Sequence, residues 1–192
     1  MIFGLPGDPT EGRLYERSQA KDGTIYGAVF SPDRLYRYAL IRLFPSSCGA
    51  LLTFVMLNPS TAHGRAGDTD ADDATIRSCV RIAKANHFVG VLVVNLFSAI
   101  STDPGGLLAV TDPVGPLGDN YLQLAGQLGK TVILGWGSHH KIRALLRPRA
   151  EAVLARLHAS GAYLLALGVN KDGEPTHPLY QPTSTPLVSY ER

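Results

Sequence analysis

Four short apolar runs, separated by segments with helical spacing, constrain the fold of this chain more than any other feature. The runs cover residues 51–57, 91–97, 131–135 and 163–167. Each is rich in strand-forming residues and bounded by turn residues, which is typical of a buried strand. Because strands that alternate with helices are joined by right-handed crossovers, the pattern predicts that these four strands lie parallel in one sheet.

The segments between and after the runs are expected to be helices. An acidic side chain at the start of a helix can accept a hydrogen bond from its first N–H groups, so Asp72 or Asp73 would cap the first helix and Asp119 the second. Proline lacks an N–H group, so Pro148 would kink or interrupt the third helix. The predicted helices cover residues 74–86, 119–128 and 139–159.

The N-terminal half adds further expected strands. Residues 26–30 have strand composition, and residues 37–44 alternate polar and apolar residues, as a half-buried strand does. A turn over residues 45–49 separates the second of these from residues 51–57. The two segments are therefore predicted to form an antiparallel hairpin.

Length and composition indicate a single domain. A chain of 192 residues with 45% hydrophobic residues can bury one sizeable core. Residues 1–24 are polar and contain several glycines, which predicts an irregular arm in front of one domain over residues 25–192. The predicted fold class is α/β, as one three-layer α/β/α domain with a mainly parallel sheet.

The lack of known motifs argues against several classes of function, and the net charge does not. The formal charge of +2 neither indicates nor excludes nucleic-acid binding. Cys48 and Cys79 form no disulfide framework, which predicts a reduced, cytoplasmic protein, and no apolar stretch approaches the ~20 residues of a membrane span. No dinucleotide or P-loop motif occurs, and no histidine has zinc-site spacing. No cofactor and no metal are therefore expected.

Polar residues stand where the apolar runs end, and in parallel sheets these ends form the ligand-binding edge. Asn58, followed by Pro59, Ser60 and Thr61, comes directly after the run 51–57. The other three positions are Asn95, Trp136 with Gly137, and His177 in the loop after the last run. We expect Asn58, Asn95, Trp136 and His177 to line one cavity.

Each of these residues also has a purely structural interpretation. Asn58 could belong to an ordinary turn, but an amide offers a donor and an acceptor at the strand end, so function is favoured. Asp73 could act as a base, and a helix cap is at least as good an explanation. Asn95 must bond either a neighbouring loop or a ligand, because an unpaired buried amide costs ~1–3 kcal/mol.

The aromatic and histidine residues leave similar alternatives. Trp136 could pack in the core or form the wall of a pocket. His177 could be a structural loop residue, or it could donate a hydrogen bond to an anion that develops during a reaction. His139 and His140 are interpreted as a solvated pair rather than as metal ligands.

The order of short motifs resembles the DUF1643 family, a bacterial and phage family of unknown function. The resemblance extends from about residue 28 to residue 187, although Ile100 and Thr176 stand where basic residues are expected. The motifs that carry it are Phe30-Ser31-Pro32, Tyr36-Arg37-Tyr38, residues 56–62, Asp73-Ala74-Thr75-Ile76-Arg77, Val94-Asn95-Leu96-Phe97, Thr102-Asp103-Pro104, Gly115-Pro116, Trp136-Gly137, Leu167-Gly168 and residues 173–180.

A weaker resemblance links the chain to uracil-DNA glycosylases. Leu57-Asn58-Pro59-Ser60 is similar to the motif in which that superfamily positions the attacking water with an asparagine. Asn95 stands where an asparagine of that superfamily reads the base edge. Next in the chain, as in that superfamily, a strand leads into a Trp-Gly pair, here Trp136-Gly137. The loop from His177 to Tyr180 takes the place of the His-Pro-Ser loop, which stabilises the leaving base and contacts the phosphate.

This second resemblance implies a glycosylase-like fold and an N-glycosidase that removes a nucleobase from DNA or from a nucleotide. The alternative is a non-catalytic module that binds a nucleotide or a modified base in the same pocket. The expected catalytic residues are Asn58, His177 and Asp73. The expected substrate-binding residues are Pro59, Ser60, Thr61, Asn95, Phe97, Trp136, Gly137 and Tyr180.

Overall fold

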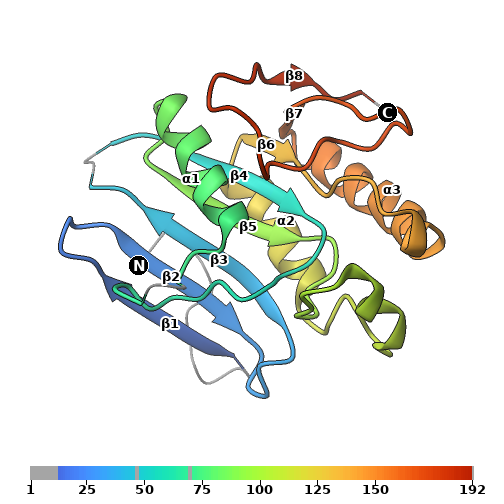
Figure 1. Cartoon of the computed structure of the whole chain (residues 1–192), viewed down its shortest axis with the longest axis horizontal. Helices are drawn as coiled ribbons and strands as arrows, with labels where there is room; N and C mark the ends of the chain where they lie inside the picture. The colour runs from blue at the N-terminus through green and yellow to red at the C-terminus, as the bar shows by residue number, and fades with distance from the viewer. Residues whose placement is uncertain (1–12, 46–47, 69–70, 192) are drawn as a thin grey trace.

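The computed structural model describes residues 13–45, 48–68 and 71–191. In this part of the chain, eight strands form one mixed sheet in the order β1-β2-β3-β5-β4-β6-β7-β8 (Figure 1). The strands are β1 (Leu14–Gln19), β2 (Ile25–Phe30), β3 (Arg37–Leu43), β4 (Leu51–Met56), β5 (Gly90–Asn95), β6 (Thr131–Leu134), β7 (Tyr163–Ala166) and β8 (Val188–Ser189).

Strands β5, β4, β6 and β7 are neighbours in this order and run parallel, which confirms the arrangement predicted from the four apolar runs. Strand β5 shows why such a run is apolar throughout. Its Val91 and Val93 face one core and its Leu92 and Val94 face the other, so the strand is buried on both faces. The carboxyl ends of the parallel strands meet at one edge of the sheet.

The prediction of a mainly parallel three-layer α/β/α fold is wrong. Among the neighbouring strand pairs of the described residues, β1–β2, β2–β3, β3–β5 and β7–β8 are antiparallel, and only three pairs are parallel. The sheet is therefore mixed, with an antiparallel ribbon built onto β5. The apolar runs revealed the parallel strands because they are buried on both faces, and the other strands carry a weaker pattern.

The predicted hairpin between residues 37–44 and 51–57 is also wrong. Strand β3 pairs antiparallel with β5, where Leu40 lies opposite Val93 and Ile41 opposite Leu92. Strand β4 has β5 on one side and β6 on the other, so neither of its edges is open to β3. Nor is β3 half-buried, because all its residues from Arg37 to Arg42 are buried.

Residues 14–19, which fall in the predicted irregular arm, form β1. This strand lies at the edge of the sheet, and most of its side chains are exposed or half-buried, so it has no apolar run to reveal it. Backbone pairing with β2 over the whole length of the strand holds it in place. Residues 1–12 of the predicted arm lie outside the described residues.

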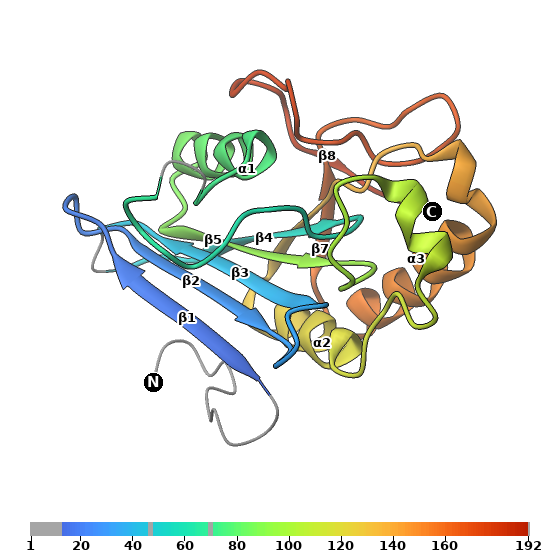
Figure 2. The ribbon, with the colours of Figure 1, turned by 60° about the horizontal axis from the view of Figure 1, so that its bottom comes forward.

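The helices cover both faces of the sheet (Figure 2). Helix α1 (Ala74–Ala85) packs Ile76, Cys79 and Ile82 on one face. Helices α2 (Gly118–Leu128) and α3 (Arg143–Ala159) lie on the opposite face. Two 3₁₀ turns complete the description, η1 (Pro104–Ala109) and η2 (His140–Ile142). None of the helices in the described ranges is long and apolar enough to cross a membrane.

The predicted helix ends are right in one case and wrong in another. Asp73 caps α1 by accepting from the Ile76 N–H at 2.9 Å. Asp119 does not cap α2 and instead pairs with Arg149 at 2.6 Å and Arg156 at 3.0 Å, which ties α2 to α3. Pro148 lies inside α3 without interrupting it.

Candidate functional site

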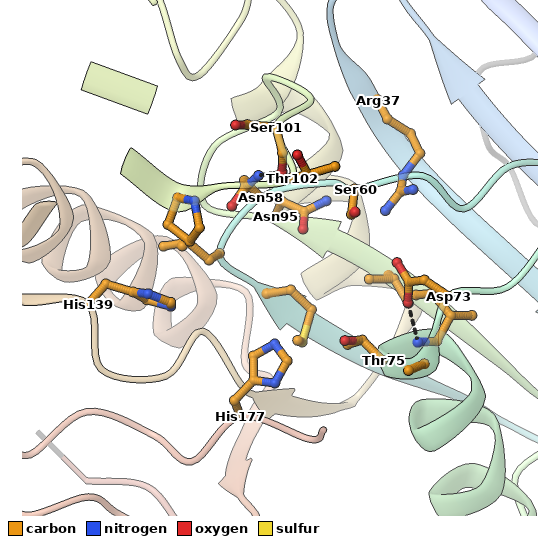
Figure 3. A pocket seen from close by; sticks show the side chains of 16 residues that line it. Arg37, Asn58, Ser60, Asp73, Thr75, Asn95, Ser101, Thr102, His139 and His177 are labelled. Atoms are coloured by element: carbon orange, nitrogen blue, oxygen red, sulfur yellow. Dashed lines mark hydrogen bonds between the residues drawn. The ribbon is translucent and has the colours of Figure 1, made fainter. Parts of the chain in front are cut away.

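A cavity of about 280 Å³ lies at the carboxyl ends of β4 and β5, beside the N-terminus of α1 (Figure 3). This is just below the ~300–1,000 Å³ that drug-sized ligands occupy, so the cavity suits a small ligand. It brings together five residues that the sequence predicted. They are Asn58, Ser60, Asp73, Asn95 and His177.

Asn95 is the last residue of β5 and is only 3% exposed. Neither its amide oxygen nor its amide nitrogen has a hydrogen-bond partner among the described residues. The sequence left two explanations for this residue, a bond to a neighbouring loop or a bond to a ligand. Because a buried amide without partners costs free energy, the observed geometry favours a ligand.

Asn58 lies on the loop that follows β4, and its orientation is fixed by two carbonyl groups. Its Nδ2 donates to the Ser101 carbonyl at 2.7 Å and to the Pro59 carbonyl at 3.0 Å. Since carbonyl oxygens only accept, both must face the NH₂ group, and the assignment of nitrogen and oxygen in the amide is determined. The amide oxygen of Asn58 is left to accept a hydrogen bond from a ligand or a water.

The backbone around Asn58 is held in the same way. The Leu96 N–H donates to the Met56 carbonyl at 2.8 Å and the Phe97 N–H donates to the Leu57 carbonyl at 2.9 Å. The ladder between β4 and β5 therefore continues past the ends of both strands. This brings Asn58 and Asn95 to the same rim of the cavity (Figure 3).

His177 lines the cavity from the opposite side (Figure 3). Its Nδ1 accepts from the Leu179 N–H at 3.2 Å, so the neutral ring carries its proton on Nε2. Burial lowers the pKa of His177 to about 4, and repulsion from His139 adds to this, while the attraction of Asp73 opposes it. His177 is therefore a neutral hydrogen-bond donor at ordinary pH.

His139 also lines the cavity, so interpreting it as half of a solvated pair is wrong. Its Nε2 donates to the Trp136 carbonyl at 2.6 Å, which leaves Nδ1 as an acceptor. Burial is the main cause that lowers the pKa of this ring. His140, by contrast, is exposed.

Trp136 does not line the cavity as predicted. Its ring is fully buried, its Nε1 donates to Glu174 Oε2 at 2.7 Å, and it meets Tyr190 edge-on at 6.3 Å. The core interpretation of this tryptophan is the right one. Gly137 next to it has φ of 74°, and a Cβ at this position would come within 3.2 Å of the His177 Cβ. Gly137 thus allows the two loops to approach each other.

Asp73 reaches the rim of the cavity while its Oδ1 caps α1 (Figure 3, dashed line). The cap is confirmed. A role of Asp73 as a base stays a prediction, because its second oxygen is not used by the cap.

Of the remaining predicted residues, Pro59 is buried beside Asn58, and its carbonyl also accepts from the Ser101 N–H at 3.0 Å.

Three predicted substrate-binding residues lie away from the cavity. Thr61 is exposed and Phe97 is buried in the core. Tyr180 is 87% exposed, and its backbone has a left-handed φ of 66°. Chain proximity to Asn58, Asn95 and His177 suggested these residues, but neighbours in a strand or a tight turn point to different sides.

Five polar residues that line the cavity were not predicted as site residues from the sequence. Arg37 and His139 come from the start of β3 and from the loop after β6. The motif Tyr36-Arg37-Tyr38 was the available indication of Arg37, and burial of the strand, which makes an arginine there unusual, is known only from the structure. The other three residues carry hydroxyl groups, and two of them also stand in motifs of the family resemblance. They are Thr75, Ser101 and Thr102.

Comparison with known families adds one result. Residues 37–179 match the family described as "Protein of unknown function (DUF1643)". The chain belongs to this family. The DUF1643 match includes every residue that lines the cavity, from Arg37 to His177. Neither a curated protein nor a solved structure matches the chain, and the resemblance to uracil-DNA glycosylases is not confirmed.

Proposed function

We propose that this DUF1643 protein binds a nucleobase in the cavity and hydrolyses its N-glycosidic bond, in DNA or in a nucleotide. The unpaired amide of Asn95 carries the proposal. A buried amide that presents an oxygen and a nitrogen matches the edge of a planar base, which offers a donor beside an acceptor. The base would supply the two hydrogen bonds that the described protein residues do not.

The other polar groups of the cavity have roles in the same reaction. The amide oxygen of Asn58 would accept from a water molecule and orient it towards the sugar carbon. A bond forms between the water oxygen and this carbon, while the bond between carbon and base nitrogen breaks and its electron pair leaves with the base. The second oxygen of Asp73 would take the proton of the water.

His177 would stabilise the departing base. The base leaves with negative charge, and a neutral Nε2–H aimed at the cavity donates a hydrogen bond to it without having to give up a proton. Such a donor acts most strongly in the transition state, where the charge develops. This explains why a neutral histidine is more useful here than a charged one, which would also bind the ground state of an anionic ligand.

A non-catalytic binding module remains the second candidate, and one observation favours it. Asp73 is the only carboxylate that lines the cavity within the described residues, and it already caps α1. Without a base, the cavity would hold a nucleotide or modified base and release it unchanged. Both candidates include a cytoplasmic location, as the two cysteines predict.

Base release from oligonucleotides with a panel of modified bases, and from free nucleotides, tests the proposal. Asn58→Ala and His177→Ala should each lower the single-turnover rate ~10²-fold or more, with a much smaller change in substrate affinity. Thr61→Ala is the matched control, because this residue neighbours Asn58 but is exposed outside the cavity. Its rate should equal that of the wild type.

The outcomes separate the two candidates. Base release by the wild type that both substitutions suppress supports the glycosidase. Binding without release across the whole panel, with affinity lost in the Asn58 and His177 variants, supports the binding module. If the wild type neither binds nor cleaves any member of the panel, both candidates fail.

A further inference from the structure

Strand β3 contains two buried arginines, and they differ in how well they are paired. Arg42 is 1% exposed and forms an ion pair with Asp72 at 2.7 Å. It also donates to the carbonyl groups of Ile41, His63 and Ala71 at 2.6–2.9 Å. Arg42 is thus a satisfied structural cation that joins β3 to the loop before α1.

Arg37 is buried to the same degree, at 2% exposed, but lacks these partners. Its Nη1 donates to the Ala62 carbonyl at 2.6 Å, and its Nε has no partner among the described residues. No carboxylate of the described residues lies within 4.0 Å of it, although Asp73 and Asp72 attract it at longer range and Arg42 repels it. A buried cation in this state is costly unless an anion approaches it.

A bulge in β3 turns Arg37 towards the cavity. Phe30 pairs with Arg37 and Val29 with Ala39, so Tyr38 has no partner on β2. Tyr38 and Ala39 both face the core beneath α2, where the Tyr38 ring stacks on Tyr121 at 5.5 Å. Strict alternation would have pointed Arg37 to that side as well. The extra residue instead aims it at the face of α1, and bulges often re-aim a side chain next to a functional site.

The first turn of α1 lies beside Arg37 at the same rim. The N–H groups of Ala74 and Thr75 have no acceptor among the described residues, since the cap engages only that of Ile76. A helix N-terminus and free N–H groups favour an anion. The hydroxyl groups of Ser60 and Thr75 also line this part of the cavity. The Asp73 carboxylate opposes an anion, but its Oδ1 is engaged by the Ile76 N–H.

We propose that Arg37 and the first turn of α1 bind a phosphate group of the ligand. Figure 3 shows the guanidinium of Arg37 directed towards the space between Ser60 and Asp73. The inference rests on the proposed function in one respect: it makes the ligand a phosphorylated nucleotide rather than a bare base or nucleoside. The phosphate belongs either to a free nucleotide or to the backbone of DNA, because both present the same group.

Binding titrations with inorganic phosphate, deoxynucleosides, their 5′-monophosphates and a single-stranded oligonucleotide test this inference. The wild type should bind monophosphates about tenfold to a hundredfold more tightly than the nucleosides, as a charge-assisted hydrogen bond to phosphate implies. Arg37→Gln should abolish this difference and leave the affinity for nucleosides unchanged. Arg37→Lys should retain part of it, because the charge remains while the planar donor geometry is lost.

Arg147→Gln is the charge-matched control, because this arginine is exposed on α3 and does not line the cavity. It should behave as the wild type, which excludes a general effect of net charge. The sources of the phosphate are separated by the ligands: preference for monophosphates indicates a free nucleotide, and preference for the oligonucleotide indicates DNA.

The inference is overturned if Arg37→Gln and the wild type show the same preference for phosphate-bearing ligands, monophosphates or oligonucleotide, over nucleosides, or if neither shows one. The phosphate site and the glycosidase activity can also be tested separately. Phosphate-dependent binding that requires Arg37, without base release, would support the phosphate site and refute the glycosidase. Base release that depends neither on the phosphate nor on Arg37 would support the glycosidase and refute the phosphate site.

Discussion

The contrast between Arg37 and Arg42 gives a prediction about stability that needs no ligand. Each residue is replaced by methionine, which is apolar and of similar volume, so that little empty space is created. If Arg37 is kept for a ligand, its removal should leave the free energy of unfolding nearly unchanged. If Arg42 is structural, its removal should lower that free energy strongly.

The magnitudes follow from the two environments. Burial lowers the pKa of Arg37 to about 10. Since one pKa unit corresponds to ~1.4 kcal/mol, holding this guanidinium charged in the folded protein costs on the order of 3 kcal/mol, which Arg37→Met removes. Against this stands the Ala62 carbonyl, which loses its donor at a cost of ~1–3 kcal/mol. The net change should stay within about 2 kcal/mol.

Burial also lowers the pKa of Arg42, but attraction and a hydrogen bond from Asp72 offset part of that cost, so Arg42→Met brings less relief than Arg37→Met. It breaks the buried ion pair with Asp72 and leaves the carbonyl groups of Ile41, His63 and Ala71 without this donor. Breaking a buried pair from one side costs ~3–5 kcal/mol. The two substitutions therefore remove the same charge from the same strand, and their effects on stability should differ by several kcal/mol.

Urea unfolding, followed by the fluorescence of the single tryptophan, Trp136, measures both variants. This residue is fully buried, so its emission reports on loss of the core. Unfolding free energies are obtained by linear extrapolation, with equal slopes required for the comparison. If Arg37→Met destabilises the protein as much as Arg42→Met, Arg37 is structural and the reasoning is refuted.

Two further predictions concern Asn95 and His177. Asn95→Leu removes an unpaired buried amide, so the variant should be as stable as the wild type or have an unfolding free energy higher by ~1 kcal/mol. Base binding should disappear in this variant. A clear loss of stability in urea unfolding would mean that the amide has a structural partner. The pKa of His177 is about 4 in the folded protein and 6.5 by default, so below pH 6.5 the unfolded state binds a proton that the folded state does not. Stability should therefore fall as the pH decreases from 6.5 to 4 and then level off, and His177→Gln should remove this part of the decrease. Base release should persist down to about pH 4 for the same reason, and a loss of rate centred near pH 6.5 would show that the histidine is not held neutral.

Much of the parallel part of the fold can be read from the sequence. The apolar runs at β4, β5 and β6 are buried on both faces, and this double burial leaves an unbroken pattern that needs no knowledge of neighbours, while β7 is partly exposed. The ends of such strands share one edge of the sheet. For this reason Asn58 and Asn95, at or just after two strand ends, could be placed in one cavity in advance, together with His177 from the last loop.

The roles of Trp136 and Phe97 could not be predicted in the same way. Both stand next to strand ends, and only packing shows that Trp136 turns inward to Glu174 while Phe97 joins the core. A residue type indicates which interactions a side chain can make, but the direction in which the side chain points depends on segments far away in the chain. The same reason explains why His139, interpreted as solvated, lies at the cavity.

The sequence by itself determined the four parallel strands and the polar groups that stand at their ends, because these properties depend on local composition. The tertiary structure alone decided that β3 pairs with β5 and that a bulge at Tyr38 aims Arg37 into the cavity. Strand pairing is a choice among long-range contacts of similar backbone energy. Whether a buried arginine is paired with a carboxylate, like Arg42, or keeps an unpaired donor, like Arg37, depends on the partners that this choice brings within reach.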